Sequence, residues 1–225
     1  MSKNRIKAGI LATAIIGCLT IGGISAYFTD TDTATNTFTI GKVEIDLNEP
    51  NWEPPTDITP NQEMKKDPQV ENTGLNDAYI FVEVTVPYKN VVTANHDGTV
   101  NPKAYTELFA YDLKEGWIEL TAEKEVSESE GIVKHVYAYA AADEMTVVEK
   151  GEVTESVFEY VKFVNLVESD ELAGTTLDVI VNAYGIQTKN LNDGKDSLDG
   201  NNDDGKISPE EVWTVISNQN QVSET

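Results

Sequence analysis

The sequence predicts an all-β protein, an antiparallel jelly-roll-like sandwich with a short C-terminal helix. Short alternating or β-branched segments are separated by turn residues about every ten to twenty positions. No strand–helix–strand rhythm is visible, and a helical pattern occurs only near the C-terminal end. The length of 225 residues suffices for one packed domain with appendages.

Residues 1–26 have the pattern of a secretory signal peptide. Its positive segment is formed by Lys3, Arg5 and Lys7. An uncharged apolar stretch follows from residue 8 to residue 24, and Ala26 is a small residue at the cleavage point. We therefore expect export, with Tyr27 as the new N-terminus.

Two alternatives to simple cleavage remain open at the leader. The apolar stretch is near the short limit for a membrane-spanning helix, so a permanent anchor is the first. Residues 15–18 also fit a loose lipoprotein box, which would place a lipid on Cys18.

Cysteine use and charge restrict the remaining 199 residues. Cys18 is the one cysteine, so the cleaved chain has no disulfide and depends on a packed core. The whole chain has 16 basic and 39 acidic residues and a net charge of −23, which loss of the leader's three basic residues lowers to −26. Such a surface repels nucleic acid and anionic lipid. We expect membrane contact only through an uncleaved leader.

Alternation predicts the clearest strands. Apolar side chains alternate with polar ones in residues 43–47 and 78–86, and we expect Pro87 to end the second strand because proline cannot donate to a ladder. In residues 132–140 one face carries Val133, His135, Tyr137 and Tyr139.

Three further segments have strand composition. Residues 109–120 are interrupted at Glu115-Gly116, which predicts a hairpin of two short strands. Residues 157–167 are rich in apolar and β-branched side chains, and residues 177–187 have apolar side chains on both faces. The last pattern is typical of a strand at the centre of a sheet.

The predicted organisation is a β domain over residues 27–190, an acidic loop over 191–207, a helix over 208–219 and a tail over 220–225. Ser208 is placed as the helix N-cap and Pro209 as the first helical residue, followed by two glutamates that the helix dipole favours.

The acidic loop is a candidate calcium site. Its spacing approximates an EF-hand loop, although one frame places a glycine at the first ligand position and the other needs an extra residue. The candidate ligands are Asp199, Asn201, Asp203, Asp204 and Glu211. A flexible acidic loop without metal is the alternative.

No motif indicates an enzyme. The chain contains two histidines, His96 and His135, which are 39 residues apart, and it lacks the H-E-x-x-H pattern of zinc proteases. A nucleophile elbow and a phosphate-binding glycine loop are also absent from the sequence. We expect no catalytic residue and no required cofactor.

The segment over residues 27–41 is a candidate donor strand. It is rich in threonine, which favours extended structure, and it directly follows the cleavage point. The residues expected to make the contact are Phe28, Thr35, Thr37, Phe38 and Ile40. Such an arm can add to the open sheet edge of a neighbouring subunit. Pairing within its own subunit is the alternative.

Four stretches resemble the TasA/camelysin family of Gram-positive exported proteins. They are AYFTDTDTATNTFTIGKVEIDLNEPNW (residues 26–52), DPQVENTG (67–74), NDAY (76–79) and VNAYGIQ (181–187). The resemblance spans residues 1–190. It implies a leader cut by a SipW-type signal peptidase, a jelly-roll domain, and biofilm-matrix fibres in which the mature N-terminal segment is the donor strand.

Three functions follow as hypotheses. The first is a secreted surface or biofilm-matrix fibre subunit whose partner is another copy of itself or a related family subunit. The second is a monomeric calcium-binding surface module. The third is a secreted metalloprotease, because some members of the resembled family have a metallo-endopeptidase label.

Overall fold

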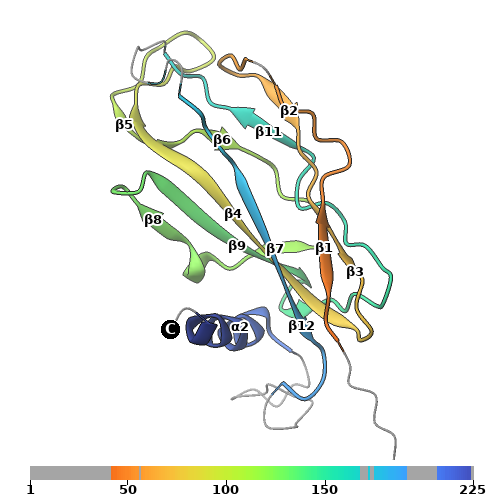
Figure 1. Cartoon of the computed structure of the whole chain (residues 1–225). Coiled ribbons are helices and arrows are strands. Elements are labelled where there is room, and N and C mark those ends of the chain that lie inside the picture. Colours follow the sequence, from red (N-terminus) through yellow and green to blue (C-terminus); the bar gives the residue numbers. More distant parts are fainter. Residues whose placement is uncertain (1–41, 56, 168–171, 173–174, 192–206, 224–225) are drawn as a thin grey trace, which may run out of the picture. The chain divides into compact units, whose positions relative to one another are not determined.

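The structure is a computed structural model that describes residues 42–55, 57–167, 172, 175–191 and 207–223. All strand pairings among these residues are antiparallel, and one helix, α2 (Pro209–Ser223), follows the strands (Figure 1). The protein is therefore mostly β with a short C-terminal helix. In the described part, no helix is both long and apolar enough to cross a membrane. The predicted leader and donor strand lie outside the described residues.

The largest sheet has seven strands built around β4 (Ala78–Val91). The strand order is β10-β9-β4-β12, while β5 pairs with β4, and β7 and β8 pair with β9. The bounds are β5 Ala104–Glu107, β7 Trp117–Glu119, β8 Glu125–Ser127, β9 Ile132–Ala141, β10 Glu144–Met145 and β12 Ile180–Gln187.

Two small sheets face this one. In the first, β1 (Ile45–Asn48) pairs with β3 (Gln69–Asn72). In the second, β11 (Tyr160–Phe163) lies between β2 (Glu63–Lys65) and β6 (Phe109–Ala110). A single turn of 3₁₀ helix, η1 (Thr121–Glu123), connects β7 to β8.

The main core lies between the large sheet and the two small ones. From β4 it receives Ile80, Val82, Val84 and Val86, all with 0% exposure, as the alternation predicts. The small sheets contribute Met64, Val70, Phe109, Val161 and Phe163. One face of β4 thus holds both layers together through apolar contact.

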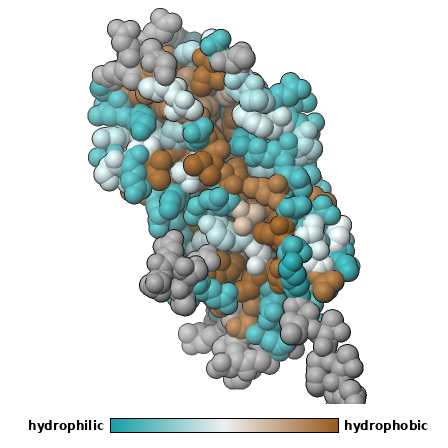
Figure 2. Space-filling view, viewed as in Figure 1, coloured by the Kyte–Doolittle hydropathy of each residue, from teal (hydrophilic) through white to brown (hydrophobic). Residues whose placement is uncertain are grey.

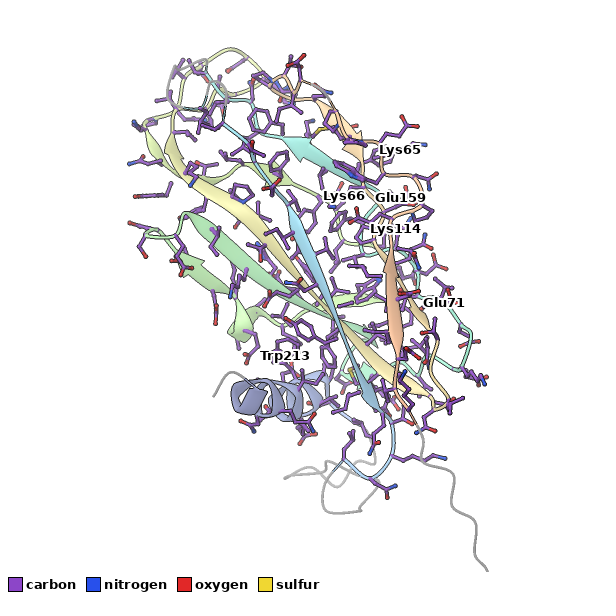
Figure 3. The ribbon with its side chains drawn as sticks, in the orientation of Figure 1. Lys65, Lys66, Glu71, Lys114, Glu159 and Trp213 are labelled. Carbon is purple, nitrogen blue, oxygen red and sulfur yellow. The ribbon has the colours of Figure 1, made fainter. Side chains whose placement is uncertain are left out.

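The other face of the large sheet is half covered by α2. Phe81 of β4 and Tyr184 of β12 both pack against Trp213, with ring centroids 5.4 Å away in each case. Figure 3 shows where Trp213 lies, between α2 and the sheet. Beyond the helix the same face turns polar, where Asn182 donates to Glu83 at 3.2 Å. The helix therefore covers only the apolar half of this face.

The predicted start of the helix is confirmed. The backbone N–H of Glu211 donates to Ser208 Oγ at 3.4 Å, so Ser208 acts as the N-cap, and α2 begins at Pro209. The helix continues four residues past the predicted end at residue 219, to Ser223.

An ion network lies on the core face at the β9 side of the large sheet. His135 is buried, with Nδ1 2.7 Å from Glu119 Oε1 and Nε2 2.9 Å from Glu107 Oε2. Lys124 Nζ donates to Glu107 at 2.9 Å. Carboxylates are acceptors, so both ring nitrogens can donate only if the imidazole is protonated. In its protonated form the imidazole donates to both carboxylates and joins β5, β7 and β9.

The pKa values of the network follow from these contacts. Burial lowers the pKa of His135, but the hydrogen bonds to Glu107 and Glu119 outweigh it and raise the pKa above its ordinary value. The hydrogen bond from His135 lowers the pKa of Glu107 to about 2, against the effect of burial. Beside the network, burial raises the pKa of Tyr111 and Tyr137, whose hydroxyls lie 2.7 Å apart.

Three predictions about strands are wrong. β4 does not end at Pro87 but continues to Val91, because Pro87 lies at the last pair of the β4–β9 ladder and just before the β4–β5 ladder. A missing donor there interrupts neither ladder. Residues 109–120 do not form a hairpin, since β6 pairs with β11 and β7 pairs with β9 in another sheet.

The third wrong prediction concerns β12, which is not central but ends the strand order of the large sheet. Both faces of β12 are apolar because each packs against a different cluster, not because the strand is central. One face packs on the main core, and the other, through Tyr184 and Ile186, packs in the cluster that α2 covers. An edge strand covered on both faces has the same pattern as a central one.

The His135 network predicts a defined pH dependence of stability. Because the pKa of His135 is raised on folding, the stabilisation is complete below about pH 6.5 and is lost as the pH rises through the folded value. Because the pKa of Glu107 is lowered, its contribution is present above about pH 4.5 and is lost toward pH 2. Urea unfolding of wild type and His135→Gln across this range measures both limbs. Parallel profiles above pH 6.5 would contradict the assignment.

Removing the Trp213 side chain should detach α2. Trp213→Ala deletes the buried ring between Phe81 and Tyr184, and we expect it to lower the free energy of unfolding by about 3 kcal/mol. The matched control, Asn218→Ala, changes an exposed residue of the same helix and should have little effect. Urea unfolding followed by far-ultraviolet circular dichroism measures both, and equal losses would refute the packing role.

Candidate functional site

The outer edge of β12 is the most distinctive feature of the large sheet. β12 pairs along its full length with β4, from Ile180 opposite Thr85 to Gln187 opposite Ala78. Within the described ranges no strand pairs with its other edge. Alternate N–H and C=O groups along an eight-residue strand therefore point outward, available to a further strand.

Apolar side chains of the core reach the surface beside this edge. These side chains pack against the main core but are only partly buried, whereas the core-facing side chains of β4 are fully buried. They come from β12 and the residues before it, and from β1 and Val43: Val43, Ile45, Leu47, Leu177, Val179, Val181 and Ala183. We call this set the edge stripe. Figure 2 shows a band of apolar atoms across the face where β12 and β1 lie in Figure 1.

The two layers approach each other closely at one end of the edge stripe. A Cβ placed on Gly185 would lie 2.8 Å from Cγ2 of Ile45 and 3.3 Å from Cγ1 of Val43. Glycine is therefore required where β1 packs over the end of β12. The chain entering β1 is fixed nearby, because the carbonyl of Lys42 accepts the N–H of Leu75 at 2.8 Å.

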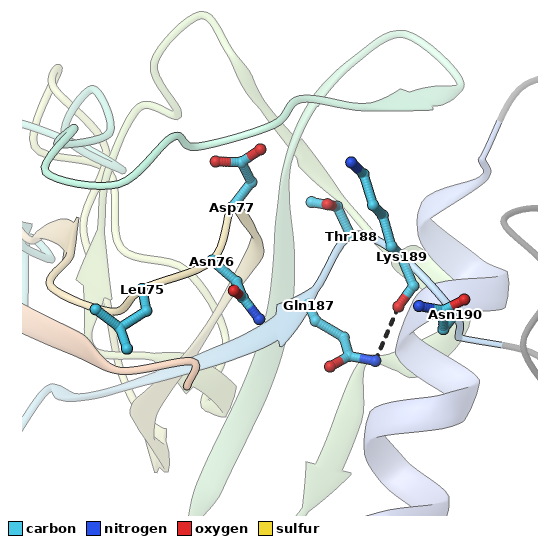
Figure 4. A pocket seen from close by; sticks show the side chains of 7 residues that line it. All are labelled: Leu75, Asn76, Asp77, Gln187, Thr188, Lys189 and Asn190. Carbon is cyan, nitrogen blue, oxygen red and sulfur yellow. Dashed lines mark hydrogen bonds between the residues drawn. The ribbon is translucent and has the colours of Figure 1, made fainter. Parts of the chain in front are cut away.

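A polar cavity of about 310 Å³ lies beyond the end of β12 (Figure 4). It is lined by Leu75, Asn76, Asp77, Gln187, Thr188, Lys189 and Asn190. Gln187 Nε2 donates to the carbonyl of Lys189 at 2.8 Å. The cavity joins the turn before β4 to the end of β12, and Asp77 and Lys189 give it one charge of each sign.

The histidines do not form a metal centre with the described residues. His96 is exposed in the turn at residues 95–99, and His135 lies in a strand with one carboxylate on each ring nitrogen. Because the two carboxylates bind opposite nitrogens, they cannot share one metal with the ring. No group of three metal-ligating side chains occurs in the part of the chain that the structure describes.

Few of the predicted site residues can be located. Ala26, Tyr27 and the donor residues fall outside the described ranges, as do Asp199, Asn201, Asp203 and Asp204. Glu211 is described and lies in the first turn of α2. The sequence did not predict the edge stripe or the contacts of His135 with Glu107 and Glu119. For the edge stripe, the available signal was Gly185, a glycine inside an apolar strand.

No curated protein sequence matches the chain. A family model described as camelysin metallo-endopeptidase matches residues 1–190. The match covers most of the chain and includes all the described strands, whereas α2 lies beyond it. The protein therefore belongs to the camelysin family, which is the TasA/camelysin family that its sequence resembles.

Proposed function

We propose that this protein is an exported surface or biofilm-matrix subunit that assembles head to tail. The N-terminal segment over residues 27–41 of one copy adds as a strand to the outer edge of β12 in the next copy. The observation that carries the proposal is that no described strand pairs with the outer edge of β12, beside the partly exposed edge stripe. One added strand would satisfy the backbone groups and cover the apolar side chains together.

The composition of the segment suits this edge. In an extended strand Phe28, Phe38 and Ile40 share one face, and Phe38 and Ile40, two residues apart, are close enough to pack on the edge stripe together. Thr35 and Thr37 lie on the opposite face. Fifteen extended residues span about 50 Å, against about 26 Å for the eight residues of β12. The segment is long enough to cover the strand and bridge to its own subunit.

The geometry of such a contact favours open assemblies. A donor segment and an acceptor edge are different surfaces, so a pair of subunits still has one free donor and one free acceptor edge. Growth then continues into a fibre. The jelly-roll strand order that the family resemblance implies is part of this proposal.

Processing precedes assembly in this scheme. A SipW-type signal peptidase cuts after Ala26, and the freed segment that begins at Tyr27 becomes the donor. Export places the protein at the cell surface or in the extracellular matrix. Copies of the same chain, or of a related family subunit, supply the acceptor edge.

The description of the matching family names a metallo-endopeptidase. The described histidines do not fit such a centre. The two carboxylates beside His135 bind opposite sides of its ring, and His96 lies exposed in a turn. We therefore propose a non-enzymatic role. Loss of caseinolytic activity on chelation, in protein free of host proteases, would instead support a protease.

Deleting residues 27–41 from the mature chain should abolish fibres and leave a folded monomer. The described domain keeps its core, while the donor is gone. Negative-stain electron microscopy and size-exclusion chromatography read out the two states. Fibres of unchanged length and number would contradict donor-strand assembly.

A negative charge on the acceptor edge of β12 should also abolish fibres, although the donor segment is intact. Val181→Glu places a carboxylate in the edge stripe, where an incoming strand would bury it unpaired. Val100→Glu, at a position 62% exposed in an isolated bridge with Ala94, is the matched control and should assemble normally. Equal fibre formation by both variants, compared by microscopy at the same concentration, would exclude this edge.

Calcium binding by the acidic loop is a separate prediction. Calorimetric titration of calcium into wild type should give heat that Asp199→Ala combined with Asp203→Ala abolishes, since hard cations need several carboxylate ligands. Absence of heat in wild type would remove the calcium module from consideration, and it leaves the assembly proposal unaffected.

A further inference from the structure

A second cavity lies on a small sheet, between β2 and the loop that follows β1. Its volume is about 520 Å³, in the range of small-molecule sites. It is lined by Pro50, Asn51, Trp52, Glu53, Pro55, Gln62, Met64 and Lys65. One aromatic ring, two proline rings and four polar side chains therefore line the cavity.

The loop that presents Trp52 is held firmly on both sides of this residue. Before it, Glu49 accepts a hydrogen bond from the buried Lys66 Nζ at 2.6 Å. Beside it, Asn51 donates twice to the buried Asp67, from its backbone N at 2.9 Å and from Nδ2 at 2.6 Å. Lys66 and Asp67, two consecutive buried charged residues directly after β2, thus fix the loop.

The indole ring itself is oriented by a cation. Lys66 Nζ lies 4.9 Å from the centroid of the Trp52 ring, in cation–π contact. Trp52 is only partly buried although it packs on the core, and it lines the cavity. A ring with fixed orientation and remaining exposure is a preorganised stacking surface.

The polar side chains around the ring have unused hydrogen-bonding capacity. Gln62 Oε1 accepts from Thr59, while its Nε2 bonds to no other described residue. The side-chain oxygen of Asn51 is likewise unused within the described ranges. Glu53 and Lys65 are exposed and form no ion pair in the described part of the chain. Both donors and acceptors therefore border the ring.

We propose that this cavity binds a neutral saccharide unit of an extracellular polysaccharide. A sugar ring has an apolar C–H face that stacks on an aromatic ring and a rim of hydroxyls that both donate and accept. The opposite charges of Glu53 and Lys65 favour a neutral ligand. A nucleotide also stacks, but its phosphates would meet Glu53 and a chain of net charge −23.

Saturation-transfer NMR on the mature chain with maltotriose, cellotriose and the trimer of N-acetylglucosamine tests this proposal. The ring C–H protons of at least one trisaccharide should receive saturation from the protein. Trp52→Ala should weaken that binding by at least about tenfold, because it removes the stacking surface. Trp52→Phe should retain part of it, and Trp213→Phe, on α2, should change nothing.

Two polar positions, one exposed and one half-buried, guard against a folding artefact, since Trp52 also contacts the core. Glu53→Ala and Gln62→Ala should each weaken binding about two- to tenfold without changing the thermal unfolding midpoint. Val181→Glu should bind as wild type does, which separates this site from fibre assembly. Saturation of none of the trisaccharides, equal binding by all variants, or saturation of a hexaproline peptide alone would overturn the proposal.

Discussion

The fold depends on the double role of β4. Its backbone is paired on both sides, by β9 and by β12 or β5, while its core face carries four side chains with 0% exposure that both layers share. Every other strand of the large sheet is placed by β4 directly or through β9. The core is fully buried around β4. What the protein can bind therefore depends on the groups that lie at the two sides of the large sheet.

The two sides differ in chemistry. At the β9 side, hydrogen bonds between charged groups connect three strands through His135, Glu107 and Glu119. Such bonds require a specific partner for each group. At the β12 side, partly buried apolar side chains lie beside backbone groups that pair with no other described strand. One side is therefore held by contacts between charged groups within the subunit, and the other side is the acceptor edge in the proposed assembly. That asymmetry suits directional assembly better than symmetric pairing.

Alternation along the sequence was enough to predict the buried face of β4, the strand β9 and the capped start of α2, because each depends on local periodicity or capping. It failed where pairing is long-range. Nothing local distinguishes β12 at an edge from a central strand, and nothing local at Glu115-Gly116 shows that the chain crosses between sheets. The short strands β2, β3 and β5 were missed for the same reason, since partners distant in sequence define them. The edge stripe could be recognised only after β12 had been placed.

Mixing two variants that cannot assemble alone tests the central claim most directly. The chain lacking residues 27–41 has an acceptor edge without a donor, and the chain with Val181→Glu has a donor without an acceptor. Light scattering coupled to size exclusion should find each variant monomeric, and the mixture should give a one-to-one heterodimer that grows no further. A mixture that stays monomeric, or one that forms fibres, would contradict strand addition at the edge of β12.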